Sequence, residues 1–359
     1  MNKKKLVVFT CCGMGDFIWA TSAISLIKNY DKNINLTLIT FDSYKLLIDH
    51  KLQIDNVICT NSKKFFSKNK IIKWIYKSYW LIKLFFYLNN FDMLICLDNH
   101  TLFIKFAKYI YRIKDIVGPD MMHFGYDEIN KNIKYYTRKV LLPKDSDRNH
   151  CMMRYQDIIR SIFPNYNLAL PILPTTDSML NKIKNNFLQN TKKYKIAFCT
   201  QGSGIWKCFP IDFSIQLLQN INKLKDVTFF IVGGTNSQYK EAVFLQESLK
   251  DIDIRNICKK TSLLELKEFL GNMDLLISVD TGVSHLAAVA NVPIISFYSA
   301  TLPEQTGVVS SKFVPLYNKI KCCPCNREIE INKKICDNPK CMTTVKIEKV
   351  LQEIKKILK

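Results

Sequence analysis

Polar residues interrupt the apolar runs of this chain at a few points, and the segment from Asp280 to Gly282 is the most informative of them. It follows the β-branched run 275–279, which predicts a strand buried on both faces of a parallel sheet. A helix is expected over 284–290 and another buried strand over 292–297. Ligands bind at the carboxyl ends of strands in such sheets, and a helix amino terminus favours an anion such as phosphate. This unit therefore predicts an anion-binding site.

Two simpler interpretations of the same unit stay open. Asp280 could be an ordinary helix N-cap in a strand–helix–strand crossover that binds no ligand. His285, one turn into the helix, could be a histidine satisfied within the core.

A second acid follows the first apolar run of the chain. The run 5–10 predicts a strand, and a loop containing Gly13 and Gly15 leads to Asp16 at the start of a helix over 17–30. A dinucleotide-binding fingerprint would need a third glycine, which is missing. Asp16 is therefore either a carboxylate that stabilises the first helical turn or a catalytic base at the end of the strand.

Glycine is scarce and its placement is uneven. Only eleven glycines occur in 359 residues, and seven of them lie in four groups at or near the ends of apolar runs: Gly13 and Gly15, Gly202 and Gly204, Gly233 and Gly234, and Gly282. Such placement indicates loops that need a positive φ angle or a close approach of the backbone to a ligand.

Apolar strand-like runs alternate with helical patterns in both halves of the chain, although no sequence repeat is visible. This alternation predicts an α/β protein of two Rossmann-like α/β/α domains that face a cleft. The linker is expected over 164–177, where three prolines lie. We therefore predict domains over 1–170 and 176–340, followed by a carboxy-terminal helix in 341–359.

The formal charge of +21 favours an anionic partner, namely nucleic acid, a membrane face or a phosphorylated substrate. The joint abundance of Lys, Asn and Ile could instead reflect biased base composition. Residues 61–91 contain seven lysines, ten aromatic residues and no acid. The helix expected over 71–88 is either a solvated helix packed on the sheet or an interfacial helix on anionic lipid, and its lysines make it a poor membrane span.

Thirteen cysteines occur, but the length of the chain and the lack of a visible signal peptide favour reduced thiols in the cytoplasm. Near the carboxyl end, Cys322, Cys325, Cys336 and Cys341 could together ligate a structural zinc ion. The irregular spacing of the last two favours a thiol cluster or a loop bridge instead.

Three segments follow one another along the chain: the Gly-x-Gly-Asp loop that ends at Asp16, Trp206-Lys207-x-Phe-Pro210, and Asp280-Thr-Gly-x-x-His285-Leu-Ala-Ala. In this order they resemble the bacterial lipopolysaccharide heptosyltransferase family, inverting glycosyltransferases of GT-B architecture. The resemblance extends over essentially the whole chain. The usual Lys-Arg-Trp-Pro-like order is altered here to Trp-Lys-Cys-Phe-Pro.

The resemblance implies an ADP-heptose donor, or another nucleotide sugar, held by the carboxy-terminal domain without a required cofactor. Asp16 would accept the proton of the acceptor hydroxyl, and Lys207 would neutralise the departing diphosphate in place of a metal. Glu241 would bond a ribose hydroxyl. The other expected donor-binding residues are Gly13, Gly15, Gly202, Ser203, Gly233, Gly234, Asp280, Thr281, Gly282 and His285.

The acceptor implied by the resemblance is a lipopolysaccharide core or a related anionic lipid-linked saccharide. The protein would then be cytoplasmic, with peripheral contact to the inner face of the membrane, which suits a basic amino-terminal half.

Three other activities compete with this one. Nothing in the sequence identifies the sugar, so a GT-B transferase using another nucleotide sugar is an alternative. A basic nucleic-acid-binding protein is a second, but none of the usual module signatures is present and no nucleic-acid partner is expected. A Rossmann oxidoreductase is disfavoured, because the third glycine is missing and no well-placed acid ends the second strand.

Overall fold

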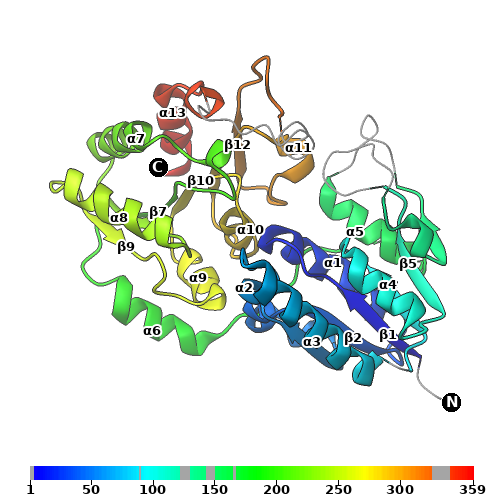
Figure 1. Ribbon diagram of the computed structural model, residues 1–359. Coiled ribbons are helices and arrows are strands. Elements are labelled where there is room, and N and C mark those ends of the chain that lie inside the picture. The colour runs from blue at the N-terminus through cyan, green and yellow to red at the C-terminus, as the bar shows by residue number, and fades with distance from the viewer. Residues whose placement is uncertain (1–3, 89, 122–129, 143–149, 165–166, 326–339) are drawn as a thin grey trace. The chain divides into compact units, whose positions relative to one another are not determined.

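The computed structural model describes residues 4–88, 90–121, 130–142, 150–164, 167–325 and 340–359. The chain divides into two compact units, Met1–Pro174 and Thr175–Lys359, called unit 1 and unit 2 below (Figure 1).

Unit 1 contains a sheet of six parallel strands in the order β3-β2-β1-β4-β5-β6. The two central strands are almost entirely apolar and buried, as strands covered on both faces by helices must be. The strands are β1 (Lys5–Phe9), β2 (Asn35–Phe41), β3 (Asn56–Thr60), β4 (Met93–Cys96), β5 (Asp115–Pro119) and β6 (Arg138–Val140).

The helices of unit 1 are α1 (Met14–Tyr30), α2 (Ser62–Phe65), α3 (Lys70–Leu88), α4 (Thr101–Tyr109) and α5 (Cys151–Arg160). Right-handed crossovers place α1 on one face of the sheet and both α3 and α4 on the other. Helix α1 lies between the sheet and α5, and its residues from Phe17 to Lys28 are all buried. Helix α3 packs through Trp80, whose ring centroid lies 5.6 Å from that of Phe103 on α4.

Unit 2 contains a second sheet of six parallel strands, in the order β12-β11-β10-β7-β8-β9. Its strands are β7 (Tyr194–Cys199), β8 (Val227–Ile231), β9 (Ile254–Asn256), β10 (Leu275–Val279), β11 (Ile294–Tyr298) and β12 (Phe313–Tyr317). Its helices are α6 (Asp177–Phe187), α7 (Ile211–Leu224), α8 (Asn236–Ser248), α9 (Leu263–Leu270), α10 (Gly282–Val289), α11 (Pro303–Thr306) and α13 (Ile347–Ile357).

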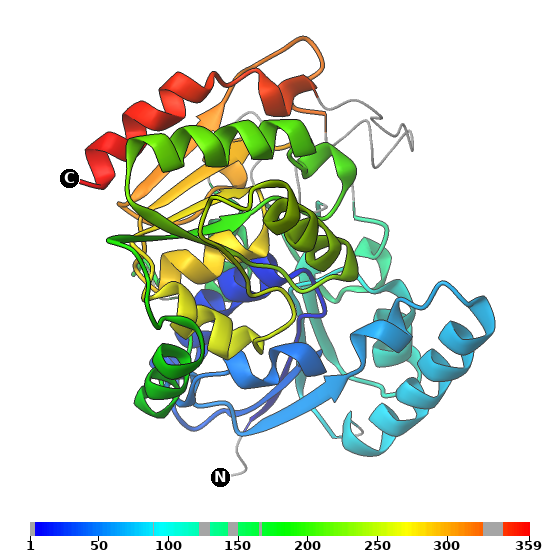
Figure 2. The same cartoon turned by 90° about the vertical axis from the view of Figure 1, so that its left-hand side faces the viewer.

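The carboxy-terminal helix α13 packs against α7 (Figures 1 and 2). Its residues Val350 and Ile354 belong to the hydrophobic core of unit 2. Helices α6 and α10 both contact α9 on the other side of the sheet. Among the residues that the structure describes, every helix is too short or too polar to cross a lipid bilayer.

The two sheets have the same strand order when each is numbered from its own first strand, so the fold repeats although the sequence does not. This is the order of the Rossmann fold, and the expected α/β class with two Rossmann-like domains is confirmed. In each sheet the order reverses beside the first strand, between β1 and β4 in unit 1 and between β7 and β10 in unit 2. Ligands bind at such switch points, beyond the carboxyl ends of the strands.

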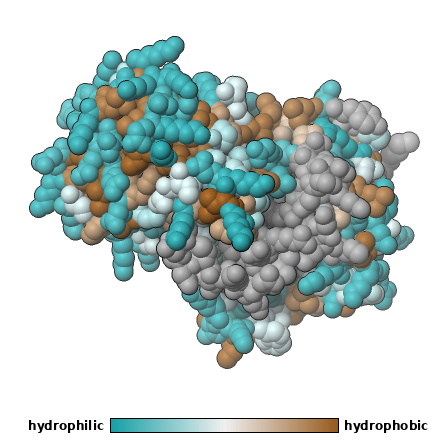
Figure 3. Space-filling model, turned by 90° about the horizontal axis from the view of Figure 1, so that it is seen from above, coloured by the Kyte–Doolittle hydropathy of each residue, from teal (hydrophilic) through white to brown (hydrophobic). Residues whose placement is uncertain are grey.

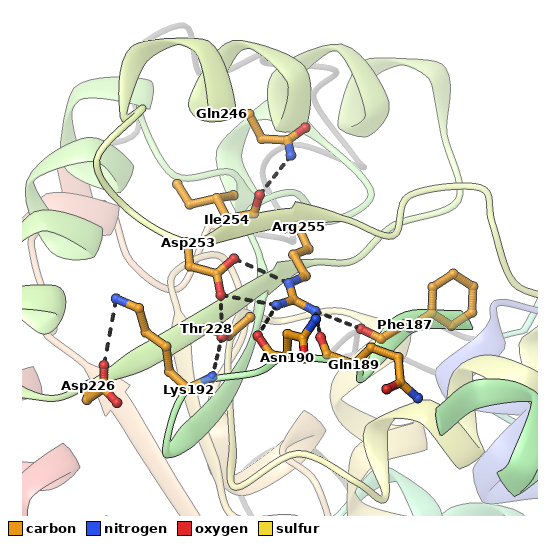
Figure 4. A network of polar contacts seen from close by, with 10 residues as sticks. All are labelled: Phe187, Gln189, Asn190, Lys192, Asp226, Thr228, Gln246, Asp253, Ile254 and Arg255. Atoms are coloured by element: carbon orange, nitrogen blue, oxygen red, sulfur yellow. Dashed lines mark hydrogen bonds and ion pairs between the residues drawn. The ribbon is translucent and has the colours of Figure 1, made fainter. Parts of the chain in front are cut away.

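Arg255 on β9 ties the carboxyl end of α6 to the edge of the unit 2 sheet (Figure 4). Its guanidinium donates to the carbonyl oxygens of Phe187, Gln189 and Asn190 at 3.2, 2.6 and 2.7 Å. The same group pairs with Asp253, whose carboxylate also accepts from the hydroxyl of Thr228. One planar group therefore satisfies the carbonyl of the last residue of α6 and two carbonyls of the loop that follows it.

We expect Arg255→Ala to lower the free energy of unfolding of the protein by about 2–3 kcal/mol, because three carbonyls lose a charged donor. Denaturant melts followed by circular dichroism would measure this change. Lys192→Ala is a suitable control, since the Lys192 Nζ pairs with Asp226 at 3.7 Å on the surface and should matter by less than about 0.5 kcal/mol. Equal effects of the two substitutions would contradict the anchoring role of Arg255.

Candidate functional site

The switch point of unit 2 brings Lys207 and Asp280 together. Lys207 lies in the loop after β7, and Asp280 is the first residue after β10. The Nζ of Lys207 donates to the Oδ2 of Asp280 at 2.6 Å, and the two side chains are only 14 % and 9 % exposed. Two charges 73 residues apart in sequence thus form a nearly buried pair at the edge where a ligand is expected.

Thr301 is a third member of this site that the sequence did not reveal. Its Oγ1 donates to the same Asp280 Oδ2 at 2.6 Å, from the loop that follows β11. Loops after three neighbouring strands therefore hold one carboxylate. Because two donors converge on that oxygen, the position of Asp280 is closely fixed.

The loop 200–210 is shaped by its own backbone. The N–H of Gly202 donates to the carbonyl of Lys207 at 2.9 Å, and that of Lys207 donates to Gly204 at 2.8 Å. A Cβ atom on Gly202 would lie 2.8 Å from the Cβ of Lys207 and 3.0 Å from the carbonyl oxygen of Asp280. The glycine is therefore needed for close approach. Neither Gly202 nor Gly13, Gly204, Gly233 or Gly234 has the positive φ angle that was the other possible reason.

The N-cap of the helix after β10 is not the residue that the simpler interpretation expected. Thr281 is its N-cap and makes no side-chain capping bond, so the interpretation of Asp280 as the N-cap is wrong. Gly282 is the first residue of α10, and the hydroxyl of Ser284 lies 2.8 Å from that of Ser278. His285 is 5 % exposed, so most of its ring lies inside unit 2.

Glu241 reaches the same region through Gln201. Glu241 lies on α8, and its carboxylate accepts from the side-chain amide of Gln201 at the start of the loop after β7. Gln238 adds a second link, because its Nε2 donates to the carbonyl of Gln201 at 3.1 Å and its Oε1 accepts from the N–H of Gly234 at 2.8 Å. The loops with Gly202 and Ser203 and with Gly233 and Gly234 are thereby held beside each other.

The expected donor-binding residues do not all lie in one unit. Gly13 and Gly15 belong to the amino end of α1 in unit 1. The other nine lie in unit 2, on the loops after β7, β8 and β10 and on the helices that follow them.

The switch point of unit 1 carries a cavity of about 500 Å³. Asp16, in the first turn of α1, lines it together with Asp98, Asn99 and His100 from the loop after β4. The hydroxyl of Tyr155 on α5 donates to the Oδ1 of Asp16 at 3.4 Å. Burial raises the pKa of Tyr155, so this phenol keeps its proton and remains a donor. The remaining lining residues are Cys11, Cys12, Gly13, Phe41, Ser43, Tyr44, Ser62, Phe65 and Phe66.

Two titratable groups that line this cavity have pKa values shifted from those of the free side chains. Burial raises the pKa of Asp98 to about 6, although N–H groups of Asn99 and Cys11 partly offset the shift. Burial, with Lys77 and Lys73 nearby, lowers the pKa of His100 to about 4. His100 is therefore neutral near pH 7, while Asp98 titrates just below it.

The raised pKa of Asp98 predicts a pH-dependent stability. The native state binds this proton more tightly than the unfolded chain, so the stabilisation is present below about pH 4 and is lost as pH rises through about 6. We expect Asp98→Asn to remove this component, so that the variant gains stability relative to the parent between pH 4.5 and 7. Thermal melts of both proteins at the two pH values test it. A constant difference in Tm would contradict the assignment.

The carboxy-terminal cysteines form part of a thiol cluster. Cys323, which is buried, is hydrogen-bonded through its thiol to both Cys325 and Cys341. The hydrogen bond with the Cys323 thiol lowers the pKa of Cys341 to about 7. Cys322 is exposed, and Cys336 lies outside the described residues. Within those residues no group of three or more metal-binding side chains is arranged around a common point.

Several known proteins resemble this chain. Lipooligosaccharide heptosyltransferase 2 of Campylobacter jejuni is 26 % identical over 175 residues, which are 48 % of this chain and 53 % of that protein. The chain thus spans about half the length of that curated relative. Lipopolysaccharide heptosyltransferase 1 of Campylobacter coli is 22 % identical over 375 residues, 98 % of each chain.

Among solved structures, the ADP-heptose lipopolysaccharide heptosyltransferase II of E. coli superposes with a TM-score of 0.73 at 15 % identity, over 99 % of this chain and 98 % of that one. This likeness places the two units within the GT-B fold. The model of glycosyltransferase family 9 (heptosyltransferase) matches residues 119–336, more than half of the sequence. The chain belongs to glycosyltransferase family 9 (heptosyltransferase).

Proposed function

We propose that this protein transfers a heptose from ADP-heptose to a lipopolysaccharide core or a related lipid-linked acceptor, with inversion at the anomeric carbon. The observation that carries the proposal is the Lys207–Asp280 pair at the unit 2 switch point, next to the amino end of α10. Family membership and the naming of the relatives as heptosyltransferases support the same activity.

The donor would bind at unit 2. Lys207 would turn from Asp280 toward the diphosphate and neutralise the charge that develops on it as the sugar leaves. The N–H groups at the amino end of α10 would contact the phosphates, and Glu241 would bond a ribose hydroxyl. The paired state with Asp280 keeps the Lys207 ammonium ordered and partly desolvated until the donor arrives.

Asp16 would act as the general base. The acceptor hydroxyl gives its proton to the Asp16 carboxylate, its oxygen attacks the anomeric carbon, and the bond from that carbon to the diphosphate breaks to release ADP. Tyr155 would hold Asp16 in place by its hydrogen bond. Such a single displacement needs no covalent intermediate.

The acceptor would be an anionic lipid-linked saccharide, and the protein would be a cytoplasmic enzyme acting at the inner face of the membrane. The excess of basic residues, +21 overall, supports an anionic acceptor and an anionic surface. No nucleic-acid partner is proposed.

Calorimetric titration of the protein with ADP, UDP and GDP, without added metal, tests the proposal. Preference for ADP would support a heptosyltransferase and justify a transfer assay with ADP-heptose. Preference for UDP or GDP would assign the same site to another nucleotide sugar. Failure to bind any of the three would overturn the transferase assignment.

A further inference from the structure

Helix α3 of unit 1 is apolar on the side that faces solvent. Its inner side packs on the sheet through Trp80, Leu81, Leu84 and Leu88, each at most 2 % exposed. On the opposite side lies a stripe of five residues separated by four, four, three and four positions, the spacing of one helical face. These are Ile71, Ile75, Tyr79, Ile82 and Phe86, which are 68, 56, 61, 62 and 78 % exposed.

The stripe is widened by one aromatic neighbour. Trp74 is 71 % exposed beside it on α3. In Figure 2, α3 lies along the outer edge of unit 1 at the lower right, and none of the described helices or strands of that unit lies against its outer side. The face drawn in Figure 3 is different, because there hydrophilic residues dominate the described surface and hydrophobic ones appear in patches between them. A contiguous exposed apolar surface of this kind is typical of an interaction site.

The charge of the segment that carries the stripe indicates the chemistry of its partner. Residues 61–91 contain seven lysines and no acid, and Lys63, Lys64, Lys68, Lys70 and Lys83 are exposed. A symmetric contact with a second copy would bring the same patch against itself, so these cations would face one another unpaired. An anionic lipid surface satisfies both features, because headgroup phosphates pair with lysines while isoleucine, tyrosine and tryptophan side chains enter the interface.

We propose that the outer face of α3 binds the surface of an anionic phospholipid membrane, with the helix lying in the plane of the interface. Its lysines and its buried inner side exclude a spanning orientation. The proposal extends the proposed function by naming the surface that holds the enzyme at its lipid-linked acceptor. It does not depend on the identity of the donor.

Trp74 provides a direct readout. Of the four tryptophans, Trp74 alone lies beside the stripe: Trp19 and Trp80 are 4 % and 2 % exposed, and Trp206 belongs to unit 2. The full chain would be mixed with phosphatidylglycerol-containing vesicles or with pure phosphatidylcholine vesicles, at low and high salt. We expect a blue shift of tryptophan emission and co-flotation with the anionic vesicles, both weakened by salt, and no blue shift in Trp74→Phe.

Matched substitutions separate the apolar contribution to vesicle binding from the electrostatic one. Ile82→Ser/Phe86→Ser should lower partition onto anionic vesicles at least about tenfold. Lys68→Gln/Lys70→Gln/Lys83→Gln should lower it on the order of a hundredfold, about fivefold per lysine. Leu168→Ser/Leu170→Ser removes two leucines that are 59 % and 57 % exposed elsewhere in unit 1 and should leave partition unchanged. All are surface changes, so thermal melts should match the parent.

Partition that is equal on both vesicle types, or unchanged by the α3 substitutions, would overturn the proposal. So would concentration-dependent self-association without vesicle binding, which would assign the stripe to a second copy. Nucleotide titration in the same variants keeps the two proposals apart, because vesicle binding can fail while ADP binding persists, and the reverse.

Discussion

Asp16→Asn will lower the rate of sugar transfer by about 10²- to 10⁴-fold and leave the affinity for the donor nucleotide unchanged. The substitution keeps the size of the side chain and removes the group proposed to accept the acceptor's proton, a contribution of that order in general-base catalysis. The donor's phosphates are proposed to bind unit 2, whereas Asp16 lies in unit 1, so calorimetry with ADP should give the parental Kd.

Thermal melts and a control variant distinguish a catalytic role of Asp16 from a role in folding. A carboxylate in the first turn of α1 also stabilises the helix by about 0.3–1 kcal/mol, so a small decrease in Tm is expected. Tyr155→Phe is the matched control, since it removes the hydroxyl that donates to Asp16 and retains the base, and it should reduce kcat far less. If Asp16→Asn weakened ADP binding as much as it slowed transfer, the assignment of Asp16 as base would be wrong.

The central strands of both sheets could be predicted from sequence because their burial pattern is simple. β1, β4, β7 and β10 lie between helices on both faces and read as apolar runs bounded by polar loops. The edge strands β6 and β12 could not. β6 has three residues within a basic segment, and β12 contains Pro315, which an edge strand tolerates but which argues against a strand in the sequence.

Part of the candidate site could be predicted from its position after a strand. Asp280 follows an apolar run directly, and Asp16 follows one after a short glycine-containing loop; the rule for parallel sheets places such residues at a ligand edge. Thr301, Gln201 and Gln238 have no such signal, because a threonine or glutamine in a loop is ordinary in sequence. Their roles arise from tertiary contacts: Thr301 meets Asp280 only because β11 pairs with β10.

The second large effect is expected at Lys207. Lys207→Met should weaken ADP binding by at least about 100-fold, because it removes the cation proposed to contact the diphosphate and leaves the Asp280 carboxylate close to those phosphates. Calorimetric titration with ADP measures the loss. Lys207→Arg keeps the charge and should retain more of the affinity, while Thr301→Val, which removes only one donor to Asp280, should have a smaller effect.

A double substitution decides what Lys207 does. Lys207→Met alone leaves a nearly buried carboxylate without its cation, which should also lower stability. Adding Asp280→Asn removes that charge, so the double variant should recover most of the lost Tm. If Lys207 serves only to neutralise Asp280, ADP binding will recover together with stability. If Lys207 contacts the diphosphate itself, the double variant will be stable and will still bind ADP weakly, and this second outcome is the one expected.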